Sequence, residues 1–270
     1  LTLADNNGNH CTITERFYIE NYSHKVDELL SNHPGLTLHY DDGSKKGQIP
    51  RDWAIKSTNG KGKLWVAECD GHDRGSLLNT KCQYCYADMM NKLVATSTLW
   101  TNNVRYYESI SDAINDKDAP DENHSIKLLK NIADNFTIDK DITINPNYYS
   151  INAAVTVNSG KTLTLGGAGT IETVQVNGAL DIQHDALTVK ELTFASAPTT
   201  TTNLSHGKFG KFDVSKTGKK AYEFLAEGYA FASTADGNVV NGYVDKLTDV
   251  KIVSHSHDMS TGACACGLSC

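Results

Sequence analysis

The chain has 270 residues, of which 39% are hydrophobic and 21% charged, a composition typical of a folded globular protein rather than a disordered one. It has 25 lysines and arginines against 32 aspartates and glutamates, and the formal net charge of -7 argues against a nucleic-acid partner. No apolar run reaches the roughly 18 residues that a membrane-spanning helix needs.

The first 100 residues are expected to form a small α+β module. Residues 16–32 have apolar side chains partly at helical spacing, and the sequence His33-Pro34-Gly35 would end this helix because proline cannot continue it. Short alternating segments predict strands over residues 36–40, 53–56, 64–68 and 93–98.

Four potential metal ligands lie near the end of this module: Cys69, His72, Cys82 and Cys85. Structural zinc is usually held by four nitrogen or sulfur ligands in a tetrahedron, and two closely spaced pairs joined by a loop are a common source. We therefore expect a structural zinc ion here. The alternative is a disulfide or redox pair between Cys82 and Cys85, although no βαβ pattern surrounds them.

After this module the sequence pattern changes to short alternating segments, which follow one predicted helix and one predicted strand. A short helix is predicted over residues 106–115, then a polar loop and a strand over residues 126–130. Eight three-residue segments follow, each with the pattern apolar-polar-apolar, so that two side chains of each would point inward and one outward. They are residues 136–138, 142–144, 155–157, 163–165, 174–176, 180–182, 187–189 and 192–194.

The spacing of these segments predicts an architecture. Val155-Thr-Val157 recurs as Val174-Gln-Val176 after 19 residues, and Leu163-Thr-Leu165 recurs as Leu180-Asp-Ile182 after 17. One coil of a parallel β-helix takes about 20 residues, whereas an antiparallel sandwich usually shows longer strands at 8–12-residue spacing. We expect a mainly β fold, a short right-handed parallel β-helix with a small N-terminal α+β Cys/His module.

The open ends of such a β-helix need covers, because an uncovered coil is an exposed sheet edge. The helix at 106–115 is the expected cover at one end and the residues from Ala221 onward at the other. The expected domains are therefore residues 1–100, 101–253 and 254–270, the last of which could begin a further module.

A second Cys/His cluster lies at the C-terminal end, where His255, His257, Cys264 and Cys266 could hold another zinc ion. Cys270 could replace one of the two sulfurs, and a disulfide-bonded tail is the alternative. The sequence has no cysteine between residues 87 and 263, which disfavours a disulfide framework spread through the fold.

Several segments share features with a known family. Residues 107–114 contain Ser-Ile-x-Asp-Ala-Ile, residues 126–129, 157–165 and 228–232 are further matching stretches, and residues 255–267 contain His-x-His followed by Cys-x-Cys-Gly. Because they contain these motifs, residues 69–270 resemble modular cell-surface proteins of gut Firmicutes that have short parallel β-helix modules and Cys/His knuckles. This family includes immunoglobulin-binding B-cell superantigens.

The resemblance implies a secreted or cell-wall-attached protein with other modules in the same longer chain and with a host protein, immunoglobulin above all, as its partner. No catalytic residue is assigned, and we expect a non-catalytic binding module. The alternative is a carbohydrate-active β-helix enzyme or a glycan-binding adhesin, but the repeat offset places Asp181 opposite Thr164 and so pairs no carboxylates. The contact surface is not predicted, and the exposed aromatic candidates are Tyr106, Tyr107, Tyr148, Tyr149, Trp53 and Trp65.

Overall fold

The computed structural model describes residues 2–4, 10–12, 36–41, 46–49, 63–68, 73–84, 87–98, 103–119, 124–197, 202–256 and 266. The chain divides into two compact units, Leu1–Lys92 and Leu93–Cys270. The division falls before the boundary that the sequence suggested at residue 100. The predicted strand at 93–98 therefore belongs to the second unit rather than to the N-terminal module.

The first unit contains a five-stranded sheet with the strand order β2-β1-β5-β3-β4. Its strands are β1 Thr2–Ala4, β2 His10–Thr12, β3 Leu36–Asp41, β4 Lys46–Ile49 and β5 Lys63–Glu68. Strand β1 runs parallel to β5, and the other neighbouring strands are antiparallel. The strands predicted at 36–40 and 64–68 are confirmed. The predicted helix at 16–32 and strand at 53–56 lie outside the described residues.

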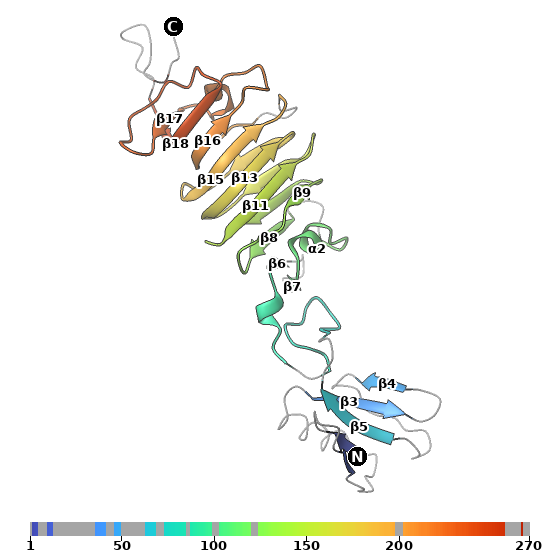
Figure 1. Cartoon of the computed structure of the whole chain (residues 1–270). Coiled ribbons are helices and arrows are strands. Elements are labelled where there is room, and N and C mark those ends of the chain that lie inside the picture. The colour runs from blue at the N-terminus through green and yellow to red at the C-terminus, as the bar shows by residue number, and fades with distance from the viewer. Residues whose placement is uncertain are drawn as a thin grey trace. The chain divides into compact units, whose positions relative to one another are not determined.

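The second unit is a parallel β-solenoid of about four turns, so the predicted fold class is confirmed (Figure 1). One sheet has the order β14-β12-β10-β8-β6-β7, and the other has the order β17-β18-β16-β15-β13-β11-β9. The strands of the first sheet are β6 Ala95–Thr98, β7 Val104–Tyr107, β8 Ser125–Leu128, β10 Ile142–Asn145, β12 Thr162–Leu165 and β14 Ala179–Ile182. Those of the second are β9 Phe136–Ile138, β11 Ser150–Val157, β13 Gly169–Val176, β15 Leu187–Phe194, β16 Lys208–Asp213, β17 Tyr229–Ser233 and β18 Lys246–Ser254.

The register of the coils agrees with the sequence repeat. Val155 pairs with Val174 in the neighbouring strand, and Leu163 pairs with Leu180. The distance along the chain between paired residues nevertheless varies, from 21 residues between Ile142 and Leu163 to 17 between Leu163 and Leu180. The corners absorb this difference, and the strands remain aligned.

One detail of the strand prediction was wrong. Residues 187–189 and 192–194 are not separate strands but the two ends of β15. Pairing between β13 and β15 skips Glu172 and Lys190, which are exposed and form an ion pair of 2.6 Å. Two successive residues at the middle of each strand point outward and interrupt the alternation of inward and outward side chains. Because of this interruption, the sequence pattern predicted two short strands where the structure has one long strand.

The core consists of ladders of aliphatic side chains, in which each coil covers the one before it. Ile126, Ile144, Leu165 and Ile182 form one such ladder, and each is at most 1% exposed. Burying a side chain of this size stabilises the fold by roughly 1.5–3 kcal/mol, so a repeated ladder supplies most of the driving force for the stack.

The N-terminal end of the solenoid is covered by β6, β7 and a short helix. Strand β6 is antiparallel to both β7 and β8, and the helix α2 spans Ile110–Ile114. The helix predicted at 106–115 is thus shorter than expected. Its N-cap is Ser109, whose Oγ accepts a hydrogen bond from the backbone N–H of Asp112 (3.0 Å), and the β-favouring residues before it pair as β7.

Antiparallel strands and an aromatic cluster cover the C-terminal end. Strand β18 pairs antiparallel with both β16 and β17 (Figure 1). Five buried phenylalanines replace the aliphatic side chains of the core at this end. One of them lies in the 3-10 helix η3 at Ala221–Phe224. The five are Phe194, Phe209, Phe212, Phe224 and Phe231, with ring centroids 4.5 Å to 6.5 Å apart in the contacting pairs.

Candidate functional site

The first candidate site is the loop around Cys82. An antiparallel bridge between Lys81 and Asp88 closes this loop, and the backbone N–H of Cys82 donates to the carbonyl of Ala87 (3.0 Å). The Cys82 side chain is 1% exposed, and its Sγ accepts the backbone N–H of Tyr84 at 3.4 Å. The sulfur thus lies inside the loop, with one backbone donor directed at it.

A second contact joins Gln83 to Asp73, the residue after His72 in the sequence. The backbone N–H of Gln83 donates to the carbonyl of Asp73 (2.7 Å), and the Gln83 amide donates to the Asp73 carboxylate (2.8 Å). The chain next to His72 therefore lies against the chain next to Cys82. The other three predicted ligands, Cys69, His72 and Cys85, lie outside the described residues.

The second Cys/His cluster has two described members. The backbone N–H of His255 donates to the carbonyl of Gly228 (2.8 Å), next to the start of β17. Cys266 is 3% exposed, packs against Ala230 and Val239, and accepts the N–H of Gly242 on its carbonyl (2.7 Å). These two described residues therefore lie against the C-terminal cover of the solenoid.

The other two predicted ligands of this cluster, His257 and Cys264, lie outside the described residues. Within the part of the chain that the structure describes, no three Cys, His, Asp or Glu side chains are grouped as metal ligands. The donor sets that the sequence offers, sulfur and imidazole, fit zinc in both clusters.

A cavity of about 210 Å³ lies beside Cys266 at the same end of the solenoid. Its walls include Tyr222, Glu227 and Phe231. Ligand pockets for drug-sized molecules usually measure about 300–1,000 Å³, so this cavity is of a size for a single side chain or a few water molecules.

The outward faces of the parallel coils carry rows of mainly polar side chains, one residue from each coil. One row runs through Ser125, Thr143, Thr164 and Asp181, and another through Thr137, Thr156, Gln175, Thr193 and Asp213. Each of these rows contains one carboxylate. Asp213 is close to the Nζ of Lys246 (3.4 Å), just as Glu172 pairs with Lys190. These described rows thus place no two carboxylates on adjacent coils, the arrangement that acid/base hydrolysis would use.

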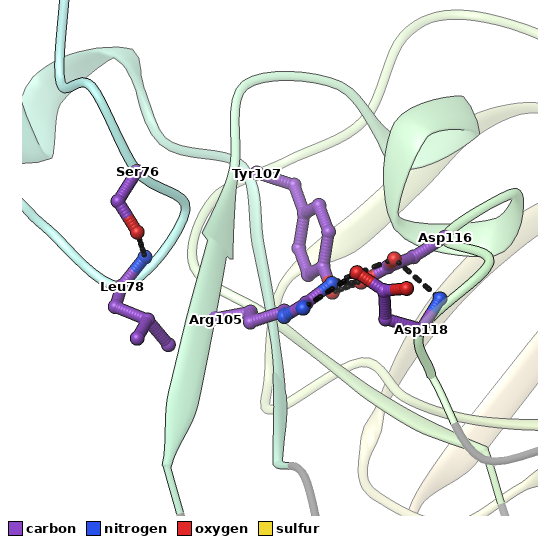
Figure 2. Close-up of polar contacts among 6 residues, drawn as sticks. All are labelled: Ser76, Leu78, Arg105, Tyr107, Asp116 and Asp118. Atoms are coloured by element: carbon purple, nitrogen blue, oxygen red, sulfur yellow. Dashed lines mark hydrogen bonds and ion pairs between the residues drawn. The ribbon is translucent and has the colours of Figure 1, made fainter.

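A polar network lies at the N-terminal cover, which the sequence did not predict (Figure 2). Arg105 donates through Nη1 to both carboxylate oxygens of Asp116 (2.7 Å and 2.6 Å) and through Nη2 to Asp118 (2.9 Å). The hydroxyl of Tyr107 also donates to Asp116 (2.6 Å). These bonds join β7 to the loop that follows α2, so the network is an internal brace.

The charges of this network stabilise one another. Desolvation disfavours the ionised carboxyl of Asp116, but hydrogen bonds from Tyr107 and Arg105 outweigh it and hold its pKa below the usual range. Burial, followed by the hydrogen bond to the Asp116 carboxylate, raises the pKa of Tyr107 well above its usual value. Both groups therefore keep their ordinary charge states, carboxylate and neutral phenol, at neutral pH.

The aromatic candidates for partner contact separate into exposed and packed residues. Tyr148 is 84% exposed, whereas Tyr149 packs against the core and Tyr107 is buried. Tyr106 is half-buried, Trp53 lies outside the described residues, and so does the side chain of Trp65.

Tyr243 is a further exposed aromatic residue, in addition to those expected from the sequence. It is 56% exposed and stacks on Tyr222, with the ring centroids 5.5 Å apart and the planes 16° from parallel. The preceding dipeptide Asn241-Gly242, a turn signal, indicated that it could lie at the surface.

Comparison of the chain with protein-family models, with curated proteins and with solved structures finds no match. Among the described residues, no helix is long and apolar enough to cross a membrane.

Proposed function

We propose that this chain is a non-catalytic binding module of a bacterial surface protein, and that it contacts a host protein. The two outward rows described above support the proposal, because each presents mainly serine or threonine and a single carboxylate. A solenoid is a rigid stack with extended outer faces, a form that proteins use for contact with other macromolecules. Immunoglobulin is the partner that the family resemblance implies, and a secreted or wall-attached location follows from the same resemblance.

A structural zinc ion in the first unit is part of this proposal. Cys82 is buried, its sulfur accepts a backbone N–H, and Gln83 binds the chain beside His72. Together with Cys69, His72 and Cys85 of the sequence, Cys82 would complete a closed four-ligand set. When bound, zinc would supply folding free energy to a small unit and no catalytic chemistry.

The alternative function is carbohydrate binding or cleavage. Cleavage needs two carboxylates on either side of the glycosidic bond, and an oligosaccharide needs a longer groove than the cavity of about 210 Å³ beside Cys266. The described part of the solenoid favours a protein partner, and the alternative becomes an outcome of the test.

The test is retention of the full chain on pooled serum immunoglobulin immobilised on a sensor surface, with serum albumin immobilised as the control. We expect saturable binding to immunoglobulin and none to albumin. A chain that ignores immunoglobulin, and instead binds or depolymerises glycans, would contradict the proposed function.

A further inference from the structure

The turn between β10 and β11 holds one aromatic side chain in the solvent. The backbone N–H of Tyr149 donates to the carbonyl of Pro146 (2.9 Å), which closes a four-residue turn. Both central residues have positive φ, 53° at Asn147 and 68° at Tyr148, as in a type I′ turn. The side chain of Tyr148 is 84% exposed.

A tyrosine is an unfavourable residue for this position. Left-handed φ is accessible to glycine at no steric cost and is tolerated by asparagine and aspartate, whereas a bulky side chain there is an outlier. Among the described residues with left-handed φ, six are glycines and two are Asn147 and Asp249. Tyr148 is the exception, so the chain keeps a strained residue whose side chain is almost fully in water.

The turn is also fixed in place. Tyr148 donates its backbone N–H to the carbonyl of Ala168 in the next coil (2.8 Å), and Asn147 donates its side-chain amide to the carbonyl of Leu128 in the previous one (3.2 Å). The next coil packs so closely that a Cβ at Gly169 would lie 2.5 Å from the Cβ of Pro146. Neighbouring coils thus hold the backbone of Tyr148 on both sides.

We propose that Tyr148 is the anchor by which this module contacts its protein partner. The inference rests on the proposed function and adds the contact residue. Tyrosine brings a large, rigid contact area at low entropic cost and a hydroxyl for a hydrogen bond, and such residues dominate protein interfaces. Its backbone is already ordered, so little more conformational freedom would be lost on binding.

The shape of the site favours a protein over an enclosed small ligand. Small-molecule ligands usually bind where a concave site encloses them, whereas an 84% exposed ring on a corner projects outward. A projecting ring fits a partner that supplies the recess itself. The partner expected here is a folded protein with an apolar recess that ends in a hydrogen-bonding group.

The test is the affinity of Tyr148→Gly for immobilised pooled serum immunoglobulin, measured by surface plasmon resonance. Glycine relieves the left-handed backbone, so the melting temperature should stay the same or rise, while affinity falls at least about tenfold. Tyr148→Phe should bind more weakly than wild type and more tightly than Tyr148→Gly, because it keeps the ring and removes the hydroxyl. Tyr243→Ala is the matched control, an exposed tyrosine with negative φ elsewhere on the solenoid, and should bind like wild type.

The outcomes separate the inference from the proposed function. Equal affinity of Tyr148→Gly and wild type would overturn the inference and leave the proposed function in place. Failure of wild type to bind immunoglobulin would remove the proposed function and the inference with it. If Tyr148→Gly loses binding to an array of glycans and not to immunoglobulin, the partner is a carbohydrate and the inference is again overturned.

Discussion

The carboxylate of Asp116 illustrates how much one residue can contribute to this fold. It is 7% exposed and is the common acceptor for Arg105 and Tyr107. Asp116→Ala would leave a guanidinium and a phenol without their acceptor, so we expect a loss of about 2–4 kcal/mol in the free energy of unfolding. Asp118 is the matched control, since its carboxylate is 75% exposed and Asp118→Ala should cost less than about 1 kcal/mol.

Urea denaturation of wild type, Asp116→Ala and Asp118→Ala measures this difference in the free energy of unfolding. The same difference is expected to depend on pH. The pKa of Asp116 is lowered in the folded state, so its contribution is present above the unfolded pKa of about 4 and disappears as pH falls through the folded value. Wild type and Asp116→Ala should therefore approach each other in stability in acid. A stability gap that stays constant down to pH 2 would contradict this explanation.

At the level of elements, the aromatic cluster closes the C-terminal end of the solenoid. Phe212 is fully buried and contacts four other phenylalanines, the nearest being Phe231 at 4.9 Å between centroids. Phe212→Ala would leave a cavity among rings that cannot all move inward, and we expect a cost of about 3–5 kcal/mol.

Phe212→Leu is the control because it keeps most of the side-chain volume, and it should cost less than half as much as Phe212→Ala. Thermal and urea unfolding of the two variants measure both values. Similar losses in the two variants would show that the ring contacts, and not the filled volume, stabilise this end.

Some elements could be predicted from the sequence because their pattern is local. Three-residue alternation with a repeat of 17 or 19 residues is sufficient to align Val155 with Val174. Tyr106 and Tyr107 were harder, since the pairing of β7 with β6 overrides the helix that was predicted from residue 106 onward.

The candidate contact residue was only half predictable. Tyr148 and Tyr149 are identical neighbours in the sequence, and the turn conformation alone decides that one is exposed and the other packs against the core. The five phenylalanines come from three strands and η3, and only Phe209 and Phe212 share a strand, so most of their contacts do not follow from any local pattern.

At the scale of the whole molecule, metal content tests the two Cys/His clusters. Metal analysis of the purified chain should find about one to two zinc ions, and chelation should destabilise the first unit, because zinc binding is coupled to folding. Cys82→Ser should lower the zinc content, and His184→Ala, in a solenoid corner and not a member of either cluster in the sequence, should leave it unchanged. A metal-free chain with all thiols oxidised would contradict the metal proposal and favour disulfides.

The unequal length of the coils has a consequence for how this molecule can change over evolutionary time. Paired strands stay aligned although 21 residues separate one pair and 17 the next, so the stack constrains the ladders and leaves the corners free in length. At the corner Asn158–Gly160 all three residues are exposed, and no atom lies within 4 Å of a Cβ built at Gly160. Loops can grow or shrink on the exposed side of such a corner while the interior is conserved, so new surfaces can arise there.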